Sequence, residues 1–405
     1  MSYKTEIIDP GDLASKLAKE INVGSYNNCP ALRVVPHEPD NFRGPVGYLW
    51  TRKILREMVD YEIDPRSGQI DRWSMMEEME NDGAGGKPQF FSLIGTPDVF
   101  RGLGWEIITM TADDFARSGR FPCIMDNELQ VKRITPQNLP LVESLFQGYG
   151  EALKKANLVN ITGEIAIMKH SITAFCDFQS DEQLILTWGA SCIGLASQRL
   201  LLNGQNIKPG MPIVGFLENG YRCNGGTFFT NLILKKYKHI QNILDNREAR
   251  EFILSLTTPS TSYAKTISRI IGWGADGYPG EAMARIAGIA HITGGGVWGK
   301  FGELLPAGVG AYLDNMPDPP DVLYQAQEMS QESELALSDY DAYGTLHGGC
   351  GMLLVANSAN DADIIIREAS RDGISAQVVG KTYDTGVLTI VSRFMNEGSY
   401  LVKKN

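Results

Sequence analysis

Residues 287–306 read AGIAHITGGGVWGKFGELLP, and the interpretation of the whole chain starts from this stretch. A run of apolar and small residues ends at Thr293 and is followed by three consecutive glycines, Gly294, Gly295 and Gly296. Because glycine accepts positive φ at little cost, such a run can bring bare backbone close to a ligand. Successive exposed amides favour an anion such as phosphate. A tight turn between two packed elements is the alternative interpretation.

The spacing of Gly294, Gly299 and Lys300 matches the G-x-x-x-x-G-K spacing of a phosphate-binding P-loop. A P-loop continues with a Ser or Thr hydroxyl that binds Mg²⁺, whereas the next residue here is Phe301. The residues that precede the glycines also resemble a helix more than a buried strand. The sequence therefore argues against a P-loop.

The chain has 405 residues and a formal net charge of −11, so it is long enough for two domains. The acidic balance argues against a nucleic-acid-binding surface, because binding to phosphate backbones needs clustered Lys and Arg. The negative net charge does not exclude a local basic pocket for a small phosphorylated ligand. Six scattered cysteines without a C-x-x-C pair, together with five histidines, argue against a structural zinc site and indicate a reducing compartment.

The N-terminus lacks the pattern of a signal peptide, and no run approaches the ~18 apolar residues of a membrane span. We therefore expect a cytoplasmic protein that binds neither membrane nor nucleic acid.

Hydrophobic patterning predicts alternating helices and strands. Helices are expected over 46–61, within 64–82, over 139–157, 228–238, from 247, and over 322–335 and 361–371. Strands are expected over 90–94, 158–168, 183–188, 190–195, 211–217, within 347–356 and over 376–380, with a hairpin in 387–402. Residues 105–111 are expected to be either a strand or a passage from strand to helix. Residues 82–88, DGAGGKP, are interpreted as a surface linker rather than a phosphate cradle.

A polar, turn-rich segment at 203–210 marks the expected domain boundary. The first domain is predicted to span residues 1–205 and the second residues 206–405.

Two groups of carboxylates are candidate ligands for a hard cation. Asp113 and Asp114 are adjacent after a predicted strand, and adjacent carboxylates can share Mg²⁺. They can equally cap a helix N-terminus. Glu164 belongs to a predicted buried strand, where an unpaired carboxylate is costly, so a functional role is favoured.

The AHITGGG motif, followed by LLP and GVGA, resembles the signature of the phosphoribosylformylglycinamidine cyclo-ligase (aminoimidazole ribonucleotide synthetase) family. Five further segments, in order and at suitable spacing, are similar to family motifs. They are ADDF at 112–115 (family V-N-D-L), TGEIAIM at 162–168 (GGETAEM), GFLENGYRCNGGT at 215–227 (GLASSGLHSNGYS), PSTSYAK at 259–265 (PTRIYVK) and GTLHGGCGM at 344–352 (RTFNMGIGM). The resemblance covers about residues 94–380.

This resemblance implies an α/β (α+β) two-domain aminoimidazole ribonucleotide synthetase-like fold. It implies an N-terminal ATP-binding and dimerisation domain with a mixed sheet and helices, a C-terminal α/β domain, and a homodimer formed mainly by the first domain. The implied reaction belongs to purine biosynthesis. ATP phosphorylates the amide oxygen of formylglycinamidine ribonucleotide, and a neighbouring nitrogen then closes the imidazole ring.

The resemblance also implies residue roles, with ATP and Mg²⁺ as cofactors. Nucleotide binding falls to Asp113, Asp114, Glu164, Thr293, Gly294, Gly295 and Gly296, with Asp114 and Glu164 on the metal. The catalytic candidates are Asn224 and His291. The phosphorylated substrate is assigned to Arg222, Asn224, Lys265 and His347.

Several positions depart from the family pattern. Arg222 stands in place of a histidine, Thr261 in place of an arginine, and Ile167 in place of a second glutamate. The family's D-G-V-G-T-K nucleotide loop is expected only as a remnant at 95–98, with Arg101, and Glu303 occupies the place of an arginine. Two alternatives therefore stand beside the cyclo-ligase. One is a repurposed homologue acting as a non-catalytic nucleotide-binding or structural homodimer, and the other is an ATP-dependent enzyme for another amide or phosphate acceptor.

Overall fold

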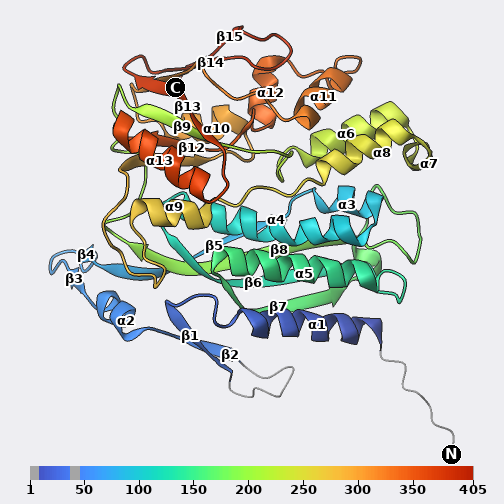
Figure 1. Cartoon of the computed structure of the whole chain (residues 1–405), viewed down its shortest axis with the longest axis horizontal. Coiled ribbons are helices and arrows are strands. Elements are labelled where there is room, and N and C mark those ends of the chain that lie inside the picture. Colours follow the sequence, from blue (N-terminus) through green and yellow to red (C-terminus); the bar gives the residue numbers. More distant parts are fainter. Residues whose placement is uncertain (1–8, 37–45, 405) are drawn as a thin grey trace, which may run out of the picture.

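The computed structural model describes residues 9–36 and 46–404, which form two large sheets and two two-stranded ones, with helices packed around and between the large sheets (Figure 1). The first half carries a four-stranded sheet of order β5-β8-β6-β7. Its strands are β5 (Met75–Gly83), β6 (Phe121–Val131), β7 (Val159–Ile167) and β8 (Leu186–Ser197). Strands β6 and β7 are parallel, whereas β8 pairs antiparallel with both β5 and β6.

The second half carries a seven-stranded sheet of order β10-β12-β9-β13-β11-β14-β15. Its strands are β9 (Pro212–Leu217), β10 (Ile286–His291), β11 (Gly310–Leu313), β12 (Cys350–Ala356), β13 (Ala376–Tyr383), β14 (Val387–Val391) and β15 (Tyr400–Lys404). This sheet is mixed as well, because β11 and β14 run parallel while the other pairs are antiparallel. Helices and mixed sheets in both halves confirm the α/β (α+β) fold class.

Three helices of the first half lie on one face of the four-stranded sheet, and α4 separates that sheet from α9 of the second half (Figure 1). They are α3 (Pro88–Ile94), α4 (Pro97–Ala116) and α5 (Leu139–Ala156). Helix α4 is buried on most sides, so apolar side chains occur around its whole circumference. This position lets the end of α4 touch the loops of the second half.

The N-terminal elements contact both edges of this sheet, since α1 packs against β7 and α2 against β5. They are α1 (Pro10–Ser25), the pair β1 (Leu32–Pro36) and β2 (Val46–Trp50), α2 (Arg52–Met58), and the hairpin of β3 (Tyr61–Ile63) and β4 (Ile70–Trp73). Asp9 caps α1 by accepting a hydrogen bond from the amide of Gly11, and Pro10 occupies the first turn, where its missing N–H costs nothing.

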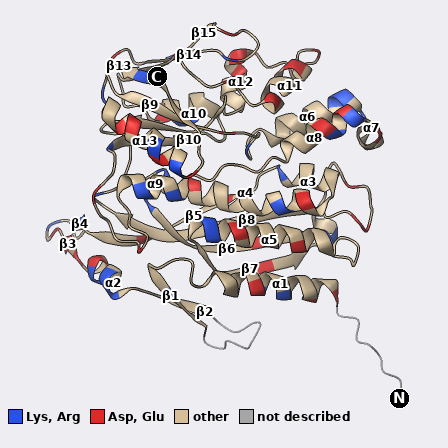
Figure 2. Cartoon of the chain, viewed as in Figure 1, with Lys and Arg blue, Asp and Glu red and all other residues tan. Residues whose placement is uncertain are grey.

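Helices also surround the second sheet. They are α6 (Gly226–Tyr237), α7 (Ile240–Asp245), α8 (Arg247–Leu256), α9 (Ala264–Ile271), α10 (Gly296–Leu304), α11 (Asp321–Ser330), α12 (Asp339–Thr345) and α13 (Ala359–Arg371). A short 3₁₀ turn at Lys169–Ser171 follows β7 in the first half. Both basic and acidic residues occur on helices such as α2 and α5 (Figure 2).

The structure contradicts several predictions for the first half. Residues 46–61 form β2, α2 and the start of β3 rather than one helix, and the helix expected within 64–82 is replaced by β4 and β5. The strand expected over 90–94 and the strand or strand-to-helix passage expected over 105–111 belong to helices α3 and α4. Apolar runs that are buried on all sides lack the helical period, so α4 is hard to distinguish from a buried strand by pattern alone.

The stretch before the triple glycine is a strand, not a helix. Residues 286–291 form β10, which is buried throughout and pairs with β12. The predictions over 139–157, 158–168, 211–217, 228–238 and 361–371 are confirmed by α5, β7, β9, α6 and α13. Of the segment 1–43, residues 1–8 and 37–43 lie outside the described residues, and α1 provides the long element that the sequence did not predict.

The strands of the two sheets fall on either side of residues 203–210, since β8 ends at Ser197 and β9 begins at Pro212. The 1–205 and 206–405 domain division itself stays a prediction, because one hydrophobic core cluster contains residues of both halves. Within residues 9–36 and 46–404, no helix has the length and apolarity needed to cross a membrane.

Candidate functional site

Three glycine-rich loops meet where the two halves of the chain touch. The first, 82–87, follows β5; the second, 223–226, precedes α6; the third, 293–296, precedes α10. A Cβ atom on Gly85 would lie 2.7 Å from the carbonyl oxygen of Cys223, and one on Gly86 would lie 3.3 Å from the Cα atom of Gly226. Side chains would therefore separate the first two loops. We call the meeting point of these three loops the loop junction.

The second and third loops present unsatisfied donors at the junction. Gly225 and Gly295 are the N-caps of α6 and α10, with φ of 88° and 89°, and no side chain in the described ranges caps either helix. The side-chain nitrogen of Asn224 is buried and has no hydrogen-bond partner among the described residues. The Oδ1 atom of the same side chain lies 3.7 Å from the position of a Cβ on Gly294. Free amides at two helix N-termini and an unused amide donor together suit an anion.

Two carboxylates face this junction from the first half. Asp82 is the second-last residue of β5, and burial raises the pKa of its carboxyl group. The hydrogen bond from Gly83 opposes that rise, the negative charge of nearby Asp114 adds to it, and the positive charge of Lys300 on α10 lowers the pKa of Asp82. Asp82, Asp114 and Lys300 therefore lie close enough to influence one another's charge.

Asp114 is held ionised by two donors. Burial would raise the pKa of its carboxyl group, but hydrogen bonds from His291 and Arg117 outweigh burial and keep this pKa below the usual range. The Nε atom of Arg117 lies 2.6 Å from Oδ1 of Asp114, and Nδ1 of His291 lies 3.2 Å from the same oxygen. Asp114 thus remains an anion at neutral pH.

His291 is a neutral, fixed imidazole. Its Nε2 atom lies 3.2 Å from Nε of Arg222, and because a guanidinium only donates, Nε2 must accept. The proton is therefore on Nδ1, which donates to Asp114. Burial and the adjacent Arg222 lower the pKa of His291 to about 4. The residue expected to be catalytic instead orients Asp114.

Arg222 is fully buried and its guanidinium is saturated, in contrast to the expected substrate-binding role. Its Nη2 atom lies 2.8 Å from Oδ2 of Asp113, and its Nη1 atom lies 2.5 Å from Oε2 of Glu218. Nη1 also donates to the carbonyl oxygen of Thr261 at 3.0 Å. Asp113 also accepts the amides of Tyr263 and Ala264 through its other oxygen. We call this group, together with His291, the arginine cluster. The ion pair between Asp113 and Arg222 joins α4 to the second half of the chain. Because each of the two side chains neutralises the other, neither is free to bind a ligand.

His347 and Lys265, also expected to bind substrate, differ in position, because His347 lies beside the arginine cluster whereas Lys265 is on the surface. His347 is buried, accepts the amide of Gly349 on Nδ1 and donates from Nε2 to the carbonyl oxygen of Gly220 at 2.8 Å. Burial lowers its pKa to about 4. Lys265 is exposed, and its Nζ atom lies 3.3 Å from Oδ1 of Asn157.

Glu164 lies on the opposite edge of the four-stranded sheet from Asp82. Gly83, Gly189, Glu128 and Glu164 are successive partners in one row across β5, β8, β6 and β7. Three strand spacings separate the ends of this row, which is about 14 Å. Within one chain, Asp114 and Glu164 therefore do not form a common metal site.

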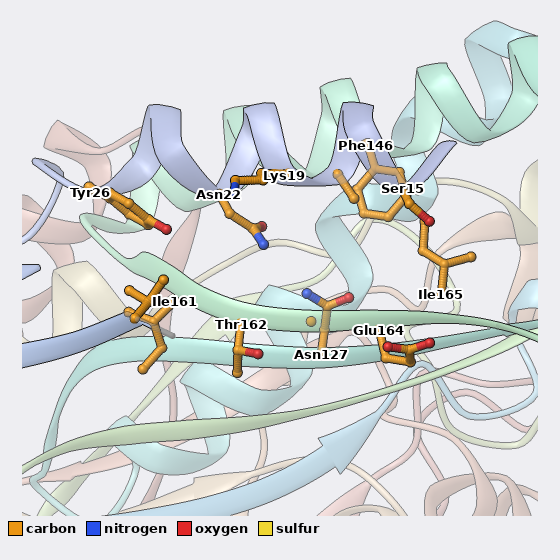
Figure 3. A pocket seen from close by; sticks show the side chains of 13 residues that line it. Ser15, Lys19, Asn22, Tyr26, Asn127, Phe146, Ile161, Thr162, Glu164 and Ile165 are labelled. Atoms are coloured by element: carbon orange, nitrogen blue, oxygen red, sulfur yellow. The ribbon is translucent and has the colours of Figure 1, made fainter. Parts of the chain in front are cut away.

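Glu164 instead lines a cavity of about 590 Å³ beneath α1. Figure 3 shows Lys19 and Asn22 of α1 above the strand that carries Thr162 and Glu164. Among the described residues, no group of three or more His, Cys, Asp and Glu side chains is placed to hold a metal ion. All six cysteines lie in the described ranges, and each is buried as a free thiol.

Comparison with known proteins shows what the chain is similar to. The family described as "AIR synthase related protein, C-terminal domain" matches residues 278–393. The phosphoribosylformylglycinamidine cyclo-ligase of Methanocaldococcus jannaschii is 24% identical over 312 residues, which cover 76% of this chain and 78% of that protein. The cyclo-ligase of Lachnospira eligens is 23% identical over 338 residues, which cover 81% and 89%. Residues 278–393 thus match the AIR synthase related C-terminal domain, and most of the chain is similar to the cyclo-ligases at low identity. The relatives carry the names of ligases, which confirms the enzyme class that the resemblance implied.

A solved structure confirms the AIR synthase-like fold over nearly the whole chain. Escherichia coli HypE, a hydrogenase maturation protein, superposes with a TM-score of 0.51 and covers 96% of both chains. At 14% sequence identity, this likeness concerns the fold alone.

The position of β5 and the similarity to the cyclo-ligases correct the prediction that the nucleotide loop is only a remnant at 95–98. Residues 82–87 read DGAGGK, follow β5 directly and match the family's D-G-V-G-T-K at four of six positions. The loop is therefore complete rather than a remnant at 95–98, and α3 and α4 fill the distance to Asp113. The expected surface linker is also wrong, because Lys87 is fully buried. Recognition of β5 as a strand was the signal that could have located this AIR synthase loop.

The lysine of this loop does not reach the junction. Its Nζ atom lies 2.8 Å from Oε1 of Glu106, 2.7 Å from the carbonyl oxygen of Thr258 and 3.3 Å from Oγ of Ser260. Those contacts satisfy all three protons of the ammonium group. In this chain, Lys87 ties the two halves together and cannot neutralise a ligand in this conformation.

Proposed function

We propose that the chain is an ATP-dependent enzyme of the cyclo-ligase type, which binds Mg²⁺-ATP and a small phosphorylated substrate at the loop junction. The observation that supports this proposal best is that two carboxylates, Asp82 and Asp114, lie near a junction that also presents the unpaired Nδ2 atom of Asn224 and the uncapped N-terminus of α10. One wall of the junction suits a cation and the other suits an anion.

The donor set fits both cofactors. Mg²⁺ is commonly held by one or two carboxylates, with phosphate oxygens and waters completing its shell. Asp82 and Asp114 supply two carboxylates, and the uncapped ends of α6 and α10 supply amides for phosphate. When bound, ATP would supply the phosphoryl group that activates an amide oxygen of the substrate.

The residues of this chain then act by position and charge. Asp114 is kept anionic and fixed in orientation by the Nδ1–H group of His291, so His291 is a positioning residue. Asn224 has a free N–H to donate to a phosphate or amide oxygen. The substrate specificity of the named relatives, closure of the imidazole ring of formylglycinamidine ribonucleotide, is proposed for this chain as well.

Isothermal titration with Mg²⁺-ATP tests the proposal. Asp82→Asn removes one negative charge, so we expect Mg²⁺-ATP binding to weaken at least tenfold, or about 1.4 kcal/mol. Stability should not change, because the only hydrogen bond of this side chain among the described residues is accepted from the amide of Gly83. Exposed Asp71→Asn is the matched control and should bind like the wild type. Glu164→Gln shows whether Glu164 takes part, for example through a second copy of the chain. Absence of Mg²⁺-ATP binding by the wild type at millimolar concentration would refute the proposal.

A second candidate is a nucleotide-binding homologue without catalysis. It is favoured by the burial of Lys87 and Arg222, which leaves few cations at the junction, and by Glu303 in place of the family's arginine. Tight Mg²⁺-ATP binding without ADP release in the presence of formylglycinamidine ribonucleotide would favour this candidate. ADP release with a different amide or phosphate acceptor would favour the other alternative, an ATP-dependent enzyme with another substrate.

We also propose a homodimer formed mainly by the first half. The resemblance implies this homodimer, and an observation on the described residues supports it. Large apolar side chains are exposed between residues 49 and 79, namely Leu49, Leu55, Val59, Tyr61, Ile63, Ile70 and Met79. Sedimentation of a monomer at micromolar concentration would contradict this proposal.

A further inference from the structure

The segment from β10 to α10 has the strand, glycine loop and helix order of a phosphate-binding loop. The sequence spacing of Gly294, Gly299 and Lys300 matched that motif, but the preceding residues were expected to be helical. The structure places the buried strand β10 before the glycines and α10 after them. One of the two objections to the motif is thereby removed.

Phe301 still excludes one part of such a site. Its ring is fully buried, and no hydroxyl is available where Mg²⁺ would bind in a P-loop. The carboxylates Asp82 and Asp114 stand on the opposite side of the junction and can serve the cation instead. The remaining question is which cation of the protein meets the phosphate.

Most basic side chains near the junction are already occupied. Lys87 and Arg222 are buried and saturated, Arg117 is paired with Asp114, and Arg120 is paired with Glu78 and Glu80. Lys300 differs, because it forms no hydrogen bond or ion pair with any residue that the structure describes. It is half-buried, yet its charge lowers the pKa of Asp82.

Helix geometry directs Lys300 toward the glycines. A side chain on a helix leans toward the N-terminus and covers the preceding turn, which for Lys300 begins at Gly296. Gly299 adds no side chain next to it, and Gly294 and Gly295 are exposed. The Nζ atom can therefore approach an anion held by the amides of this loop and by Nδ2 of Asn224.

We propose that Lys300 is a specificity-determining residue that binds the phosphomonoester group of the substrate, in the role first assigned to Arg222 and Lys265. This inference rests on the proposed function and names the phosphate-bearing half of its site. A phosphomonoester carries nearly two negative charges at neutral pH, so one uncommitted cation beside free amides distinguishes it from an uncharged sugar.

Titration of the full-length protein with ribose 5-phosphate and with ribose tests this role. We expect the wild type to bind the phosphate and not ribose, Lys300→Met to bind ribose 5-phosphate at least tenfold more weakly, and Lys300→Arg to stay within about threefold of the wild type. Lys208→Met removes the same charge from an exposed site after the first half and should behave like the wild type. Equal affinity of Lys300→Met and the wild type, or no binding of ribose 5-phosphate by the wild type, would overturn the role of Lys300.

Mg²⁺-ATP titration of the same variants separates the two proposals. Lys300→Met should keep Mg²⁺-ATP affinity within about threefold, because Asp82 and Asp114 remain. A loss confined to Mg²⁺-ATP would assign Lys300 to the nucleotide and overturn its substrate role, while the proposed function would stand. A carboxyl-carbon NMR titration gives an independent readout, since Lys300→Met should raise the pKa of Asp82 and Lys208→Met should not.

Discussion

The arginine cluster and the loop junction are joined through Asp114 and His291, yet they differ in how well their polar groups are satisfied. In the arginine cluster, Arg222 is fully buried and its guanidinium contacts two carboxylates, an imidazole and a carbonyl oxygen. At the junction, the Nδ2 atom of Asn224 and the ammonium group of Lys300 have no partner among the described residues. Both regions carry family motifs, but only the second has groups to spare for a ligand.

The largest effect is expected from breaking the arginine cluster. Arg222→Met leaves Asp113 and Glu218 buried without their cation, and removal of one partner of a buried ion pair typically costs about 3–5 kcal/mol. Urea unfolding should show this loss, whereas Arg66→Met on the surface should change stability by less than about 0.5 kcal/mol. A loss below about 1 kcal/mol for Arg222→Met would mean that the cluster is not structural.

A smaller effect should appear as pH dependence. The pKa of His347 falls from 6.5 to about 4 on folding, so between these values the unfolded chain binds more protons at this residue. The free energy of unfolding should therefore increase with pH across that window, by up to about 3 kcal/mol, with no further loss below pH 4.

His347→Asn removes this titration and provides both an acceptor and a donor for the neighbouring backbone groups. The difference in stability between wild type and variant, measured at pH 4.5 and pH 7, should shift in favour of the wild type as pH rises. The comparison cancels the contributions of other groups, such as Asp113. A pH-independent difference would show that His347 is not held neutral.

The smallest expected effect distinguishes the first and third glycines of the triple-glycine loop. Gly296 has φ of 58°, and a Cβ there would lie 2.1 Å from the carbonyl oxygen of Tyr343, so Gly296→Ala should cost about 2–3 kcal/mol. Gly294 meets only Oδ1 of Asn224 at 3.7 Å, and Gly294→Ala should change stability by less than about 0.5 kcal/mol. Thermal unfolding measures both, and we expect Gly294→Ala to weaken ribose 5-phosphate binding instead. Equal stability losses would show that the third loop serves packing alone.

Sequence patterns predicted the second half of the chain better than the first. Strand β9, helix α6 and helix α13 have one apolar face or clear turn residues at their ends, so the pattern identifies them. Helix α4 is buried on most sides and β5 is rich in Met and Glu, which favour helices, so burial and pairing with β8 override local preference. The misassigned β5 also concealed the DGAGGK loop, because that loop is recognised by the strand before it.

The candidate site could also be predicted only in part, but here the reason is not a misassigned element. Motif matching placed Asn224 and residues 293–296 at a common site, and the structure brings them together. It also assigned Arg222, His291 and His347 to a ligand, because a sequence does not show whether a polar side chain already has a partner. Asp82 and Lys300 become candidates only when β5, α4 and α10 are seen to converge.

The packing of α9 has a consequence for how the molecule opens. The indole of Trp273, just after α9, donates to the carbonyl oxygen of Gly119 at 2.8 Å and packs against Phe121 at the start of β6. Residues 264–277 thus belong to the second half in sequence but to the first sheet in contacts. Amide hydrogen exchange should follow the contacts, with α9 protected as one cooperative unit with α4 and β6. Any opening of the loop junction would then require the chain to yield in the segments that flank this unit, 257–263 and 278–285.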